Sequence, residues 1–121
     1  MKITPVKTTG PDERGFTAEY FHGRLGTQLI VFRKAGTVSG RHYHKGISIA
    51  KNPEIFILLS GTCIANWREV NGSQLHTATI TGPTMTEIPP YTWHEFVTIT
   101  DCTFIELNSL SEHAADTFYV E

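Results

Sequence analysis

The stretch that decides the fold is residues 36–44, Gly-Thr-Val-Ser-Gly-Arg-His-Tyr-His, in which one residue separates His42 from His44. Successive side chains of a β-strand point to opposite faces, so this spacing predicts that both imidazoles lie on the same face. Glu54 opens the apolar stretch Ile-Phe-Ile-Leu-Leu at 55–59. A carboxylate at the start of a buried strand is costly unless a cation or hydrogen bonds compensate its charge. The two histidines and the acid therefore indicate a metal site.

A third histidine completes the candidate ligand set. His94 closely follows the rigid turn Pro89-Pro90, where a strand would bring it beside the other three side chains. Three histidines and one carboxylate suit Zn, Fe, Mn, Ni or Co. We therefore expect His42, His44, Glu54 and His94 to bind one divalent metal ion. The alternative is a metal-free pocket in which the histidines form hydrogen bonds.

The rest of the chain is typical of an all-β protein. Six stretches rich in β-branched and aromatic residues predict strands at 28–32, 55–59, 63–67, 77–80, 95–99 and 103–107. Asn71-Gly72 predicts a hairpin that joins the third of these strands to the fourth. Only 109–116 favours a helical turn, with Ser111 as its cap. Short strands at this spacing predict a sandwich or barrel.

Composition narrows the functional classes. A length of 121 residues predicts one domain, and a net charge of −2 argues against a nucleic-acid partner. No apolar run is long enough for a signal peptide or a membrane span, so we expect a cytoplasmic protein without a membrane partner. Cys63 and Cys102 lack metal-binding spacing and are expected to be reduced and buried.

The histidine and acid spacings resemble the two motifs of the cupin superfamily. Gly36, five residues, then His42 and His44, followed by Glu54, six residues, then Gly61, match the first motif. The longer interval before Glu54 indicates an inserted loop at 47–50. The segment from Gly82 through Pro89 to His94 resembles the second motif, although Tyr91 replaces its usual glycine and its asparagine is missing. The resemblance implies an all-β, single-domain cupin over 1–121, a double-stranded β-helix or jelly-roll barrel, with 1–26 as an irregular N-terminal segment packed on the barrel.

Two closer resemblances point to bacterial surface-polysaccharide metabolism. Residues 88–96 (IPPYTWHEF) and 13–16 (ERGF) resemble nucleotide-sugar 3,4-ketoisomerases, relatives of the dTDP-rhamnose epimerase cupins. That family implies acid/base catalysis by His42 and His44 without a metal. Residues 40–45 (GRHYHK) and 51–56 (KNPEIF) resemble the zinc-binding C-terminal cupin domain of capsular-polysaccharide enzymes, which implies a retained metal. Either family implies isomerase- or epimerase-type proton transfer on a keto-sugar nucleotide or related carbonyl compound.

Further side chains are weaker candidates. Arg33 and Arg41 are candidates for binding a diphosphate through bidentate hydrogen bonds. Aromatic side chains that could stack on a sugar or base are Tyr43, Trp67, Tyr91 and Trp93. Glu87 and Glu106 are potential general bases if they point inward. The histidines outside the motifs, expected at the surface, are His22, His76 and His113.

Two other functional classes remain open at this stage. The same ligands would suit a dioxygenase-type cupin that holds Fe or Ni and acts on a small acid or enol. A non-catalytic metal- or sugar-binding cupin module is the other alternative. In each case open sheet edges favour a homodimer.

Overall fold

The computed structural model describes residues 1–120, and these residues form eleven strands and one short helix. The strands are β1 (Lys2–Pro5), β2 (Thr8–Asp12), β3 (Gly15–Ala18), β4 (Leu29–Arg33), β5 (Val38–His42), β6 (Glu54–Ser60), β7 (Thr62–Glu69), β8 (His76–Thr81), β9 (Thr84–Ile88), β10 (Thr92–Thr98) and β11 (Cys102–Glu106). The helix is α1 (Leu110–Ala115), and no helix in the described residues is long and apolar enough to cross a membrane.

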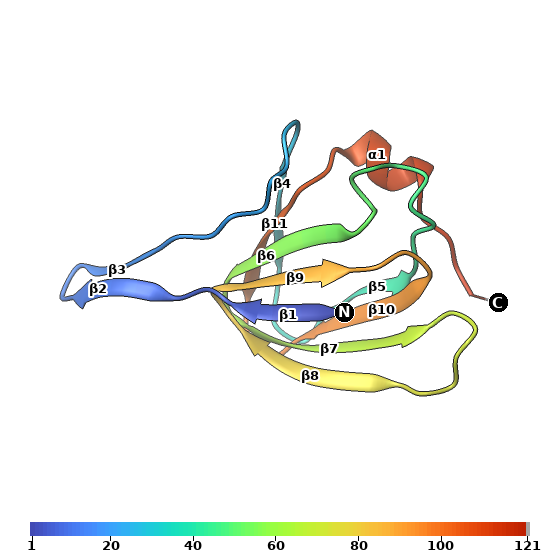
Figure 1. Cartoon of the computed structure of the whole chain (residues 1–121). Coiled ribbons are helices and arrows are strands. Elements are labelled where there is room, and N and C mark those ends of the chain that lie inside the picture. The colour runs from blue at the N-terminus through green and yellow to red at the C-terminus, as the bar shows by residue number, and fades with distance from the viewer. Residues whose placement is uncertain (121) are drawn as a thin grey trace.

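Two antiparallel sheets face each other. One has the order β1-β9-β6-β11-β4 and the other β5-β10-β7-β8. Figure 1 shows that α1 and the long loop between β5 and β6 lie together at one end of the sheets. The all-β double-stranded β-helix predicted from the sequence is confirmed.

The core lies between the sheets because the strands alternate in burial. On β10 every second residue, from Thr92 to Thr98, is buried. Phe56 and Phe96 meet edge to face with ring centroids 4.7 Å apart, and Phe104 packs against both rings. Cys63 and Cys102 are free and buried, as expected.

The predicted elements are present, with five additional strands. All six predicted strands are present with shifted ends, and the connection around Asn71-Gly72 joins β7 to β8. The additional strands are β1, β2, β3, β5 and β9. The cap of α1 is Ser109 rather than Ser111, because Ser109 Oγ accepts from the backbone N–H of Glu112 at 3.1 Å. The Glu112 carboxylate in turn accepts from the Ser109 N–H at 2.8 Å, a capping box.

The N-terminal segment 1–26 differs from the expectation of an irregular stretch. It contains three strands, of which β1 joins the five-stranded sheet beside β9. Strands β2 and β3 pair only with each other and project away from the sheets in Figure 1. After them, Arg24 donates to the carbonyl oxygen of Ala50 at 3.1 Å and anchors the segment to the loop before β6.

A β-bulge between β5 and β10 determines which side chains face the interior. His42 pairs with His94, whereas Gly40 pairs with Glu95, so Arg41 is an extra residue with a φ of 61°. A one-residue slip sends each following side chain to the other face of a sheet. The bulge therefore turns His42 inward and leaves Arg41 on the outer face, where it bonds to Glu95 at 3.1 Å.

The bulge leads to a prediction about Gly40, which has a φ of 89°. A Cβ atom at Gly40 would lie 2.8 Å from the carbonyl oxygen of His94, whereas one at Gly10 would contact nothing within 4 Å despite a φ of 59°. We expect Gly40→Ala to lower the free energy of unfolding by about 1–3 kcal/mol more than Gly10→Ala in urea titrations. Equal losses would show that close approach to His94 does not require glycine here.

Candidate metal centre

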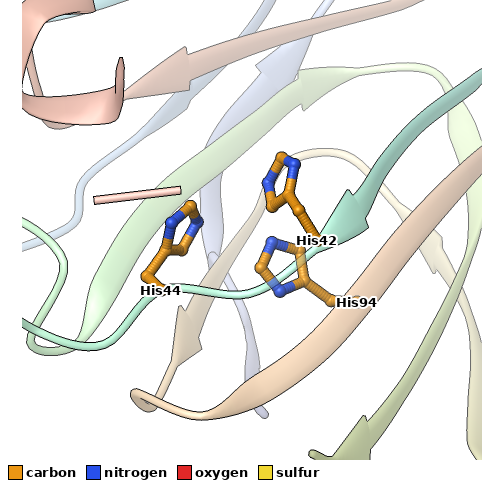
Figure 2. A group of neighbouring side chains, drawn as sticks. All are labelled: His42, His44 and His94. Atoms are coloured by element: carbon orange, nitrogen blue, oxygen red, sulfur yellow. The ribbon is translucent and has the colours of Figure 1, made fainter. Parts of the chain in front are cut away.

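Three histidines converge inside one end of the barrel. His42 comes from the end of β5, His44 from two residues further on, and His94 from β10. Figure 2 shows the three imidazoles grouped together, and the ring centroid of His42 lies 4.9 Å from each of the other two. One ring nitrogen from each histidine lies within 4.8 Å of the others. The two histidines predicted to share one face are thus joined by His94 from β10, and the three rings form a cluster of nitrogens.

Glu54 reaches the same cluster from the first residue of β6. Its Oε2 lies 2.6 Å from Nε2 of His44, and its Oε1 lies 3.7 Å from Nε2 of His94. Glu54, His44 and His94 are all buried. The long loop before Glu54 therefore does not move the carboxylate away from the histidines. The possible ligand atoms form two overlapping groups, one of His42, His44 and His94 and one of His44, Glu54 and His113.

Backbone carbonyl groups fix the tautomers of two of these histidines. Nδ1 of His44 lies 2.6 Å from the carbonyl oxygen of Asp116, and Nδ1 of His94 lies 2.9 Å from that of Thr92. A carbonyl oxygen only accepts, so each Nδ1 carries the hydrogen. In the neutral form of either ring, Nε2 is then left with a lone pair that points toward Glu54. This is the usual outer-sphere arrangement of a metal-binding histidine.

Nε2 of His44 is a buried polar atom without a hydrogen bond. Glu54 Oε2 lies only 2.6 Å away, a distance at which the two groups form an ion pair if the imidazole also carries a proton on Nε2. Two lone-pair atoms at this distance repel each other unless a proton or a cation compensates. Unpartnered nitrogen beside a carboxylate, with two further histidines in reach, is a donor set that fits a divalent ion such as Zn.

The electrostatic environment favours the metal-binding forms of these residues. Burial, followed by repulsion from His94 and His44, lowers the pKa of His42 to about 3. Burial also lowers the pKa of His94, so both rings remain neutral near pH 7. Burial raises the pKa of Glu54, but the contact with His44 and the charge of the Lys51 ammonium outweigh it and hold that pKa well below its usual range.

Sequence reasoning missed four residues that support this site. Lys51, Asn108 and Asp116 are fully buried around it, and His113 from α1 reaches it. The expectation that His113 is a surface residue was wrong, since it is half-buried and its ring centroid lies 5.3 Å from that of His42. One of its ring nitrogens also lies within 4.8 Å of possible ligand atoms of His44 and Glu54. No sequence motif connects these residues to the histidine pair.

Asp116 connects the C-terminal segment to the loop before β6. Its carboxylate accepts from the backbone N–H groups of Lys45 at 2.8 Å and Ser48 at 3.1 Å, while its carbonyl binds His44. One residue thus orders the predicted inserted loop and orients a candidate ligand.

The cluster opens into a cavity between the two sheets. Besides His42, Glu54, His94 and His113, the residues that line it are Val31, Arg33, Ser39, Gly40, Phe56, Phe96, Phe104 and Glu106. Burial and the nearby charge of Glu54 raise the pKa of Glu106. A carboxylate with a raised pKa beside a candidate metal site is suited to accept a proton from a substrate.

The other predicted substrate contacts lie in different places. Arg33 lines the cavity, where its Nε donates to Ser39 Oγ at 3.0 Å. Trp67 and Tyr91 line a second groove, and Arg41 lies on the outer face. Trp93 lies beneath the guanidinium of Arg68, whose central carbon is 5.8 Å from the ring centroid.

The remaining weaker candidates lie outside the cavity. Tyr43 stacks on Tyr91 with ring centroids 6.0 Å apart, and Glu87 lies 3.6 Å from the Lys2 ammonium. Of the other histidines, His76 is exposed and stacks on Trp67.

Solved structures with similar folds include several nucleotide-sugar enzymes. The QdtA 3,4-ketoisomerase from Thermoanaerobacterium thermosaccharolyticum, in complex with TDP, superposes with a TM-score of 0.73 at 16% identity, covering 98% of this chain and 86% of that one. The epimerase RmlC from Legionella pneumophila, in complex with dTDP-4-keto-L-rhamnose, gives 0.69 at 20% identity, covering 98% and 71%. No protein-family model and no curated protein sequence matches the chain.

The capsular polysaccharide assembling protein CapF from Staphylococcus aureus is also similar. Its structure gives a TM-score of 0.63 at 22% identity over 97% of this chain. The matched region is 34% of the CapF chain, so this chain spans about a third of the length of CapF. These similarities show that the chain has the RmlC-type cupin fold.

Proposed function

We propose that the chain is a metal-binding cupin enzyme of the isomerase or epimerase type. Its substrate would be a keto-sugar nucleotide, or a related carbonyl compound, in bacterial surface-polysaccharide metabolism. The fold similarity to RmlC and QdtA, both in complexes with thymidine nucleotides, supports this substrate class. The cofactor would be one divalent ion held by His42, His44, Glu54 and His94.

The observation that carries the metal proposal is the state of His44. Its Nδ1 is committed to the Asp116 carbonyl, and its buried Nε2 lies unbonded 2.6 Å from a carboxylate oxygen. A divalent cation bound by both groups would remove the repulsion between them. This supports a ligand role for the histidine pair in preference to the acid/base role that the ketoisomerase resemblance implies.

The proposed reaction assigns proton transfer to Glu106. When bound, the ion would act as a Lewis acid and make the C–H bond next to the substrate carbonyl more acidic. Glu106, in the same cavity, takes that proton, since burial raises its pKa and makes it a better base. Return of a proton to the former carbonyl carbon, with the neighbouring hydroxyl proton passing to the former carbonyl oxygen, moves the ketone by one carbon. Delivery of a proton from solvent to the opposite face of the original carbon instead inverts that centre. Arg33, which lines the cavity, would bind a phosphate group of the substrate.

Metal analysis tests the ligand set. We expect one divalent ion per chain, and we expect His42→Ala, His94→Ala or Glu54→Ala to weaken its binding by at least about 100-fold, because losing a direct ligand exceeds the loss of an outer-sphere partner. Competition with a chromophoric chelator measures the affinity. His76→Ala is the matched control and should bind normally, because His76 lies outside the site. Absence of a stoichiometric ion would contradict the proposal, and undiminished binding by Glu54→Ala would remove Glu54 from the ligand set.

Hydrogen exchange tests the reaction. In deuterated water the protein should exchange the protons next to the ketone of a dTDP-4-keto sugar, as followed by proton NMR. We expect Glu106→Gln to slow this exchange by about 100- to 10,000-fold while metal affinity stays within about twofold. Glu87→Gln is the control carboxylate outside the cavity. Oxygen consumption without exchange would favour a dioxygenase. If neither exchange nor oxygen consumption is detected with this substrate, the proposed isomerase is contradicted.

We also propose that two copies pair along β4. This edge strand exposes Ile30 at 79% and Phe32 at 53%. Ile30 pairs with Ile105, which packs against a buried apolar cluster that includes Ile57 and Leu107. An exposed apolar edge strand favours pairing with another copy. Light scattering should give a dimer for the wild type and for Leu75→Glu, an exposed control, and a monomer for Ile30→Glu with Phe32→Glu. A monomeric wild type would contradict this assignment.

A further inference from the structure

The most unusual residue near the proposed metal centre is Lys51. Its side chain is fully buried at the end of the loop before β6, and sequence reasoning gave it no role. Lysine is almost never fully buried unless its charge is paired. The contacts of Lys51 therefore indicate what this charge does.

The ammonium group of Lys51 has three acceptors. It donates to Glu54 Oε2, to Asn108 Oδ1 at 3.1 Å and to His113 Nδ1 at 3.0 Å. An ammonium has three hydrogens, so these contacts use all of them. Two of the acceptors come from the segment after β11, which therefore helps to hold the ammonium against Glu54.

The same contacts give the two carboxylate oxygens of Glu54 different surroundings. Oε2 is shared between Lys51 and His44, whereas Oε1 is directed toward His94 at 3.7 Å. A divalent ion bound to Glu54 would thus share one buried carboxylate with an existing positive charge. Like charges repel strongly where water is excluded, so the ammonium must weaken the binding of the ion. Without an ion, the same ammonium compensates the buried carboxylate.

We propose that Lys51 is a resident counter-cation of the centre, which stabilises the metal-free protein and lowers its affinity for divalent ions. This inference rests on the proposed metal site and adds the regulation of that site. An ion held against an internal positive charge is more readily exchanged. The metal-free protein also remains folded, because Glu54 is never left as an uncompensated buried charge.

The proposal predicts two opposite effects of Lys51→Met, which keeps the side-chain length but removes the charge. In chelator competition with Zn²⁺ and Ni²⁺, the variant should bind at least about tenfold more tightly than the wild type. In the metal-free state its Tm should fall by at least about 5 °C, because Glu54 loses its compensating charge. A lysine that only supports packing would lower both the affinity and the Tm when replaced.

Lys45→Met is the matched control. Lys45 adjoins His44, but its ammonium lies over the Phe118 ring, 4.1 Å from the centroid. Its removal should change the affinity less than about twofold, because surface charges are screened. If metal-free Lys51→Met does not fold, it can be purified with Zn²⁺ present, and release of the ion to excess chelator should be at least about tenfold slower than from the wild type.

The outcomes separate this inference from the proposed function. Tighter binding or slower release in Lys51→Met supports the counter-cation. Equal or weaker binding, with a wild type that does bind metal, overturns the counter-cation alone. If only Lys51→Met binds an ion, the inference holds and the wild type is not a metalloprotein. If neither protein binds an ion, the metal proposal and the inference both fail.

Discussion

The fold and the candidate metal centre depend on one constraint, which is that the charge of the buried Glu54 carboxylate must be compensated. The side chain opens the central strand of the five-stranded sheet and is almost fully shielded from water. An isolated charge there would be strongly destabilising. Three side chains from different parts of the chain lie against this carboxylate: His44 after β5, Lys51 before β6, and His94 on β10. The two sheets, the long loop and the C-terminal helix therefore meet at this carboxylate, and the centre and the fold depend on the same contacts.

Two local devices bring the histidines to that carboxylate in a usable form. The bulge at Arg41 turns His42 to the interior opposite His94, and it requires close approach of Gly40 to the His94 backbone. Carbonyl groups of Asp116 and Thr92 then direct the second ring nitrogen of two histidines inward. Phe56, Phe96 and Phe104 line the cavity next to the cluster, with Arg33 and Glu106 beside them.

The sequence allowed the fold and the cluster of candidate ligands to be predicted because these depend on local patterns. Alternation along the strands identifies the sheets, and one residue between His42 and His44 places them on one face. The supporting residues could not be predicted in this way. His44 and Asp116 are separated by 72 positions and Lys51 and His113 by 62, and no periodicity links them. The bulge at Arg41 could not be predicted either. An unbroken strand would pair Arg41 with His94 and turn His42 outward. Expecting His113 at the surface failed for the same reason, because only the docking of α1 brings it to the centre.

The most direct test of the metal centre is the protonation of its imidazoles. Nitrogen-15 NMR of the protein with one equivalent of Zn²⁺ distinguishes a ring nitrogen that carries a proton from one that binds metal. The account predicts that His44 and His94 each keep the proton on Nδ1 and that each Nε2 is shifted by the metal, with no proton attached. If either Nε2 remains protonated after Zn²⁺ is added, the contacts with Asp116 and Thr92 do not prepare a metal ligand, and the central claim is contradicted.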